Sequence, residues 1–195
     1  MKNPIMIGER LYLRPEEVED AAPSARWDAE ETDDFTDDFG RFPSSPITFA
    51  ESAKKGAALE MPGTISLMAC LRESNEPIGI VGITDINWVN RTGETFSFFA
   101  PGGAYRGSGY GTEAKLLLLE YGFERLGLHI IQSVVWEANE RSAAALLKQG
   151  YQPAGRFKWD GTRRGVYMDA LLFDVKHDEF LTSREAVRAR DSART

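Results

Sequence analysis

Hydrophobic and polar positions change their spacing several times along the chain, and each change marks an expected element. Residues 8–14 alternate apolar and polar side chains, as a half-buried strand does, and the acidic residues after Pro15 indicate the start of a helix. Residues 28–38 are strongly acidic with phenylalanines between the acids, and a second short helix is expected over 48–59. The N-terminal third thus predicts a strand followed by two helices.

From residue 64 the pattern becomes that of strands. Apolar and β-branched runs predict strands over 65–71, 78–86 and 94–100, with a turn between the first two at 73–77. Short connections between successive strands are typical of an antiparallel meander.

A helix with a broad apolar face is expected next, over 112–126, and Gly127 ends it. A β-branched and aromatic run then predicts a strand over 129–136, and a short helix follows over 140–148, ended by Gly150.

The last two strands are expected over 151–159 and 164–174. They would be joined at Asp160-Gly161, because Asp-Gly favours a tight hairpin. The whole order of elements predicts one α/β domain with a mixed sheet.

Composition narrows the class of protein. The 195 residues are 42% hydrophobic and 27% charged, which suits one globular domain, expected over 1–181 and followed by a charged tail over 182–195. No apolar stretch reaches the roughly 20 residues that span a bilayer, and the first residues lack the apolar core of a secretory signal. Cys70 is the only cysteine, so no intramolecular disulfide is expected. These features predict a cytoplasmic location without a membrane partner.

The charge balance argues against a nucleic-acid partner. The formal net charge is -7 and the sequence pI is about 5.0, and no basic face is evident outside the arginines of the tail. An acidic protein would sooner attract a cationic partner, although net charge alone does not identify one.

A glycine-rich run over 106–111 stands between a predicted strand and a predicted helix. A helix N-terminus offers unpaired amides and a partial positive charge, and glycines let the backbone approach an anion, so the run predicts a phosphate-binding loop. Its Gly-x-Gly-x-Gly spacing lacks both the Gly-x-Gly-x-x-Gly of dinucleotide sites and the Gly-Lys-Ser/Thr of nucleotide P-loops. A tight turn without a ligand is the alternative.

Several motifs together resemble one superfamily. The spacing Arg106-x-x-Gly109-x-Gly111 is similar to the Arg/Gln-x-x-Gly-x-Gly/Ala motif of GNAT acetyltransferases. Asn139-x-x-Ser142 is similar to a motif in the branch that holds ribosomal-protein N-terminal and spermidine acetyltransferases. Two further matches to that branch are Gly150-Tyr151 and Val166-Tyr167-Met168-Asp169. The resemblance covers residues 8–174.

This resemblance implies a fold and a cofactor site. The fold would be a mostly antiparallel sheet of about six to seven strands, flanked by about four helices, with a splayed parallel strand pair. Acetyl-CoA would be the acetyl donor, without a metal, its pyrophosphate on the amides of the glycine run and its pantetheine arm along the preceding strand. The implied cofactor-binding residues are Phe98, Phe99, Ala100, Arg106, Gly107, Ser108, Gly109, Tyr110, Gly111, Thr112 and Asn139. Asn139 could equally be an ordinary helix N-cap.

The reaction implied is direct attack of a primary amine on the thioester in a ternary complex. Glu94 is expected to take the proton of the amine, with Asp85 as the second candidate, and Ser142 to protonate the leaving thiolate. A solvent-facing strand end is the alternative for Glu94, and an ordinary helix hydroxyl is the alternative for Ser142. Leu146 and Leu147 stand where many members of the superfamily place a tyrosine acid.

The acceptor site of the family is walled by the first helices and the final hairpin, so the acidic segment would attract a cationic amine. A polyamine, an aminoglycoside and a peptide N-terminus all fit that description, and a solvated acidic loop is the alternative. The substrate-binding candidates are Asp33, Asp34, Phe35 and Asp85. An acyl-CoA-binding sensor without turnover and an unrelated phosphate-binding module stay open as functions. The resemblance also allows a homodimer.

Overall fold

The structure is a computed structural model, and it describes residues 1–31, 45–57, 61–102, 105–163 and 165–192. The chain forms two compact units. The first unit comprises residues 1–86 and 96–118, and the second comprises residues 87–95 and 119–195.

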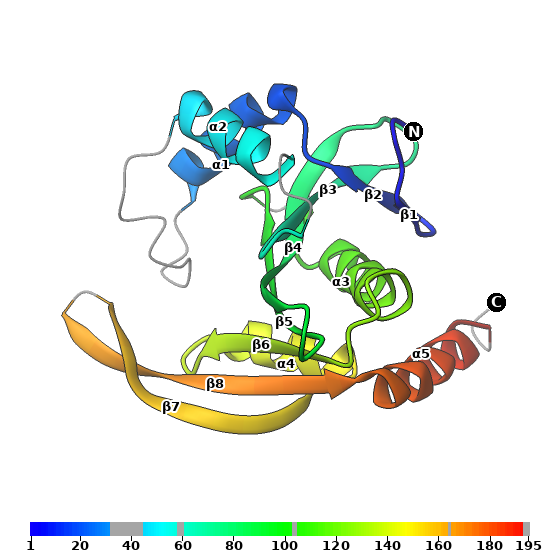
Figure 1. Cartoon of the computed structure of the whole chain (residues 1–195), viewed down its shortest axis with the longest axis vertical. Helices are drawn as coiled ribbons and strands as arrows, with labels where there is room; N and C mark the ends of the chain where they lie inside the picture. The colour runs from blue at the N-terminus through cyan, green and yellow to red at the C-terminus, as the bar shows by residue number, and fades with distance from the viewer. Residues whose placement is uncertain (32–44, 58–60, 103–104, 164, 193–195) are drawn as a thin grey trace. The chain divides into compact units, whose positions relative to one another are not determined.

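The first unit combines a set of antiparallel strands with two helices that pack on each other, α1 and α2 (Figure 1). Its elements are β1 (Met6–Ile7), β2 (Leu11–Pro15), a 3-10 turn η1 (Val18–Asp20), α1 (Ala21–Glu30), α2 (Pro46–Ala57), β3 (Ile65–Leu71), most of β4 (Pro77–Asn87) and most of α3 (Tyr110–Glu120). Leu13 lies opposite Ala69 in the β2–β3 pair, and Leu67 lies opposite Val81 in the β3–β4 pair. The meander expected from the sequence is therefore present.

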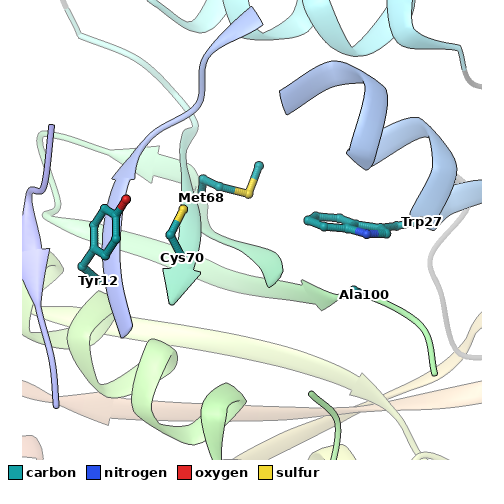
Figure 2. Close-up of a cluster of buried hydrophobic side chains, with 5 residues drawn as sticks. All are labelled: Tyr12, Trp27, Met68, Cys70 and Ala100. Atoms are coloured by element: carbon teal, nitrogen blue, oxygen red, sulfur yellow. The ribbon is translucent and has the colours of Figure 1, made fainter. Parts of the chain in front are cut away.

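A buried cluster holds α1 against these strands. Trp27 points from α1 toward the strands, Met68 and Cys70 come from β3, and Tyr12 comes from β2 (Figure 2). All five are at most 5% exposed, so each contributes apolar area that leaves water on folding. Ala100, which directly follows Phe99 at the end of β5, belongs to this cluster. The cluster therefore fixes the chain shortly before the glycine-rich run.

The second unit is built around β6, β8 and β7, which are paired antiparallel, with β8 between the other two. Its elements are a π-helical turn η3 (Tyr121–Arg125), β6 (Ile130–Trp136), α4 (Glu140–Lys148), β7 (Gln152–Arg163), β8 (Val166–Lys176) and α5 (His177–Ser192). The β7–β8 hairpin is long, and α5 follows β8 directly (Figure 1).

Strand β5 (Thr92–Phe99) contributes residues to both units. The hydrogen-bonded order of the strands is β1-β2-β3-β4-β5-β6-β8-β7, and the pairing of β5 with β6 is parallel. That pairing registers Thr92 to Glu94 against Ile130 to Gln132 and then ends. The expected mixed, mostly antiparallel sheet with a splayed parallel pair is confirmed, with eight strands and five α-helices among the described residues.

The predicted turn at Asp160-Gly161 is wrong. Both residues lie inside β7, which continues to Arg163, and the chain turns at Gly165, whose φ is +79°. A register shift between Phe157 and Gly161 absorbs the extra residues as a bulge. Gly161 is needed for packing instead of turning, because a Cβ there would lie 2.1 Å from Cη2 of Trp136.

Two element boundaries also differ from expectation. Pro15 ends β2, so the first helix begins only after the turn η1, where the Asp20 side chain accepts from the Glu17 amide. At the other end, α5 runs through residue 182, where we expected a tail to begin, and Arg184 on it pairs with Glu120 and Glu124. The division of the chain at residue 181 stays a prediction.

Candidate cofactor and catalytic site

The glycine-rich run adopts the backbone of an anion-binding loop. Gly107 and Gly109 have φ values of +79° and +85°, a backbone conformation that residues other than glycine rarely adopt. The Gly109 carbonyl accepts from the Glu113 amide at 3.1 Å, so α3 begins directly after Gly109. The amides of the next residues, from Tyr110 on, are therefore first-turn donors that lack an intrahelical acceptor and attract negative charge. This backbone suits an anion, and its use for the pyrophosphate of coenzyme A stays a prediction.

Gly111, the third glycine, has a different role. Its backbone is helical, and a Cβ there would make an ordinary contact of 3.5 Å with the Phe99 ring. The loop conformation therefore depends on Gly107 and Gly109, whereas neither backbone strain nor packing against Phe99 requires glycine at position 111.

Arg106 uses its side chain within the protein. Its guanidinium donates to the Phe99 carbonyl, with Nη2 at 2.7 Å, and pairs with Glu31 at the end of α1. It also lies 5.9 Å from the centre of the Phe98 ring. Any contact of Arg106 with the cofactor would thus come from its backbone amide, and that contact stays a prediction.

The strand residues expected along the pantetheine arm are all in the first unit. Phe98 packs against the buried cluster and Ala100 belongs to it. The Ala100 amide donates to the Ile78 carbonyl at 2.9 Å, and the Phe99 carbonyl accepts from Arg106. Both main-chain groups therefore already have one partner, and the predicted pairing with pantetheine is untested.

Arg10 contacts the glycine-rich loop, and the sequence did not predict this contact. It precedes β2, and its Nη1 donates to the Ser108 carbonyl at 2.9 Å while its Nε donates to Glu113 Oε2 at 2.9 Å. The guanidinium lies 4.5 Å from the centre of the Tyr110 ring. No sequence pattern joins residues about a hundred positions apart, so only the fold could reveal this contact.

The second unit carries the predicted base, Glu94, at the point where the β5–β6 pairing ends. Glu94 is half-buried, and its neighbour Thr95 takes part in a buried hydroxyl network. Thr95 Oγ1 lies 2.7 Å from the Tyr151 hydroxyl and 3.2 Å from the Gln132 carbonyl, and the Ser133 hydroxyl donates to the Thr95 carbonyl at 3.2 Å. Side chains thus bridge the two strands where main-chain pairing stops.

Tyr151 supplies the phenol of this hydroxyl network. Its side chain is fully buried, and this burial raises the pKa of its phenol far above the ordinary range, with the nearby charge of Glu94 adding to the effect. The phenol therefore stays protonated and serves as a buried hydrogen-bonding group that fixes the start of the splay.

Asn139 is the N-cap of α4. Its Oδ1 accepts from the Ser142 amide at 3.1 Å, so the alternative of an ordinary cap is observed, and the amide nitrogen of the side chain is not used in that bond. Ser142 is half-buried in the first turn of the helix, Leu146 is buried and Leu147 is exposed. The predicted roles of Asn139 and Ser142 stay predictions.

The substrate-binding candidates are placed only in part. Asp33, Asp34 and Phe35 lie outside the described residues. Asp85 is exposed near the end of β4, with a φ of +49°. Cys70 is buried in β3, and this burial raises the pKa of its thiol, which disfavours a nucleophilic role.

Asp169 of the motif in β8 fixes the bulge of β7. Its carboxylate accepts from the Trp159 amide at 2.9 Å and from Arg156 Nε at 2.6 Å, and these two donors hold its pKa below the ordinary value. Arg156 also donates to Glu137, two residues before Asn139. The bulge is thereby tied to the turn that leads into α4.

In the described part of the chain, no helix is long and apolar enough to cross a bilayer, and no group of three or more His, Cys, Asp or Glu side chains could hold a metal ion.

The parallel pairing of β5 with β6 that ends at Glu94, and the glycine-rich loop that opens α3, are both features that the sequence resemblance implied. A family model described as an acetyltransferase (GNAT) domain matches residues 10–152. The chain belongs to this family.

The curated relatives that the chain matches are named as N-acetyltransferases. The uncharacterized N-acetyltransferase p20 of Bacillus licheniformis is 26% identical over 180 residues, which cover 88% of this chain and 96% of that protein. The SPbeta prophage-derived uncharacterized N-acetyltransferase YokL of Bacillus subtilis is 26% identical over 111 residues, which cover 56% and 61%. The uncharacterized N-acetyltransferase YoaA of Bacillus subtilis is 29% identical over 104 residues, which cover 53% and 58%. The chain thus matches about three fifths of the length of two of these relatives.

Solved structures share the fold. A spermidine N-acetyltransferase from Vibrio cholerae in complex with CoA and spermine has a TM-score of 0.78 and 20% identity, covering 89% of this chain and 99% of that chain. An acetyltransferase (GNAT family) from Bacillus anthracis has a TM-score of 0.74 and 20% identity, covering 89% and 98%.

Proposed function

We propose that the protein is an N-acetyltransferase that moves the acetyl group of acetyl-CoA to a primary amine. The observation that carries this proposal is the loop of Gly107 and Gly109, which opens α3 in a chain that the acetyltransferase family model matches over residues 10–152. Acetyl-CoA would supply a thioester, which is already activated for attack by an amine.

The residues of each unit, taken by itself, have proposed roles of their own. In the first unit, the amides after Gly109 hold the pyrophosphate, because the backbone there offers donors and the positive end of a helix dipole. In the second unit, Glu94 takes a proton from the amine, which must be neutral to attack, and Ser142 returns a proton to the leaving thiolate. Asn139 caps α4 and thereby fixes the turn of the helix that carries Ser142.

We infer that the acceptor is a cationic amine. The net charge of -7 supports this class, as does the exposed carboxylate of Asp85. The structural neighbour that was solved with CoA and spermine supports a polyamine, while an aminoglycoside or a peptide N-terminus has the same charge. The cytoplasmic location and the homodimer expected from the sequence also stay predictions.

The test is release of free thiol from acetyl-CoA in the presence of spermidine, spermine, an aminoglycoside, a basic peptide and a neutral amine. We expect thiol release with cationic acceptors, and a loss of roughly a hundredfold or more in kcat for Glu94→Gln without a change in the Kd of coenzyme A. Glu73→Gln, a change at an exposed turn residue, is the matched control and should leave kcat unaltered.

Two results would contradict the proposal. If Glu94→Gln and Glu73→Gln had equal rates, Glu94 would not be the base. Tight binding of coenzyme A with no thiol release on any acceptor would instead support an acyl-CoA-binding sensor. That alternative has one observation in its favour, because Leu146 and Leu147 stand where a tyrosine acid is expected.

A further inference from the structure

The Arg10 side chain, directly before β2, contacts the glycine-rich loop over residues 106–111, which we call the phosphate loop, and the first turn of α3. It donates to the Ser108 carbonyl, pairs with Glu113 in the first turn of α3, and lies over the Tyr110 ring. A Cβ on Gly109 would lie 3.2 Å from its Nη2. The guanidinium therefore lies directly against the loop that is proposed to hold the pyrophosphate.

Glu113 creates an electrostatic problem for that site. A carboxylate in the first turn of a helix is favourable for the helix itself, but it repels a second anion at the same end. This carboxylate cannot turn away easily, because its Oε1 also accepts from the amides of Arg10 at 2.8 Å and Leu11 at 3.3 Å. The Glu113 side chain is only 16% exposed, so water screens its charge incompletely.

We propose that Arg10 is a positioning residue that makes the loop receptive to phosphate by neutralising Glu113. The argument rests on the proposed function, since it takes coenzyme A as the anion. Through Nη1 the same guanidinium holds the Ser108 carbonyl, which keeps that acceptor fixed on the side of the loop where Arg10 lies. The essential contribution is the positive charge, and the bond to Ser108 is secondary.

The test compares the Kd of coenzyme A, measured by calorimetry, for the wild type and four variants. Arg10→Gln leaves Glu113 charged and should weaken binding about tenfold. Arg10→Lys keeps the charge and should recover most of that loss, and Arg10→Gln combined with Glu113→Gln should recover it too, because both remove the excess negative charge. Glu113→Gln alone should bind at least as tightly as the wild type. Pantetheine, which has no phosphate, should bind all variants alike.

Salt gives a second readout. The penalty of Arg10→Gln should shrink as ionic strength rises, because the repulsion it exposes is screened. A purely structural clamp predicts the opposite set of results: Arg10→Lys as weak as Arg10→Gln, no recovery in the double variant, and no dependence on salt. Those results would overturn the proposal. Failure of the wild type to bind coenzyme A would instead refute the proposed function.

Discussion

The positive φ values of the phosphate loop give a prediction whose magnitude follows from the structure. Gly107 and Gly109 both have φ near +80°, where an L-residue is disfavoured by about 1–2 kcal/mol. Gly107 has open space at its Cβ position, so Gly107→Ala tests backbone strain alone. Gly109→Ala adds a contact with Arg10 Nη2, which is the end of a flexible side chain and can move.

The strain can appear in two measurements. If the loop keeps its conformation, Gly107→Ala lowers the free energy of unfolding by about 1–2 kcal/mol and leaves the Kd of coenzyme A unchanged. If the loop relaxes to a conformation with negative φ, the free energy of unfolding recovers. The loop amides then no longer point toward the anion, and the Kd of coenzyme A rises by up to about 5–30-fold. The two free-energy changes should therefore sum to about 1–2 kcal/mol.

Urea denaturation measures the free energy of unfolding, and calorimetry measures the Kd of coenzyme A. Gly111→Ala is the matched control, because its backbone is helical and its new methyl group would make only an ordinary contact with Phe99. It should change the free energy of unfolding by no more than about 0.5 kcal/mol. An effect of Gly111→Ala as large as that of Gly107→Ala would refute the reasoning, as would a Gly107→Ala variant with wild-type stability and affinity.

Three further predictions concern the supports of the site. Asp20→Asn leaves the buried Arg14 guanidinium without its counter-charge, so urea denaturation should show a loss of about 3–5 kcal/mol; a loss below about 1 kcal/mol would mean that water reaches the pair. Asn139→Ala should cost about 1 kcal/mol through the lost helix cap, whereas Asn139→Asp, which keeps the acceptor, should not; equal losses would contradict the cap. Arg156 and the Trp159 amide hold the pKa of Asp169 below its ordinary value of 3.8. The ionised carboxylate of Asp169 therefore adds fully to the free energy of unfolding above that pH, and this contribution is lost as pH falls through the folded-state pKa. The stability gap between wild type and Asp169→Asn should therefore narrow as pH falls below about 4, and a gap that stays constant or widens on acidification would contradict this assignment.

Local patterns were enough to predict the elements whose structure depends on near neighbours. The strand over 65–71 and the helix over 140–148 have the expected bounds, because alternation and capping act within a few residues. The glycine run was equally readable, since positive φ and a helix start are local properties.

Features that depend on distant residues could not be predicted in this way. The Asp-Gly pair in β7 looks like a turn, but the packing of Trp136 against Gly161 and the bonds of Asp169 made it part of a bulge. Likewise, Arg106 belongs to a cofactor motif, yet its guanidinium is held by the Phe99 carbonyl and by Glu31, which follows α1. Here tertiary contacts decided what a locally clear signal meant.

The division of β5 has a consequence for any attempt to study half of this protein. The chain passes between the two units at residues 86/87, 95/96 and 118/119, and the second of these crossings falls within one strand. No single stretch of the gene therefore encodes either unit, and no proteolytic cut can release one unit intact. Dissection would need paired fragments, because a cut between residues 118 and 119 still leaves residues 87–95 of the second unit in the N-terminal fragment.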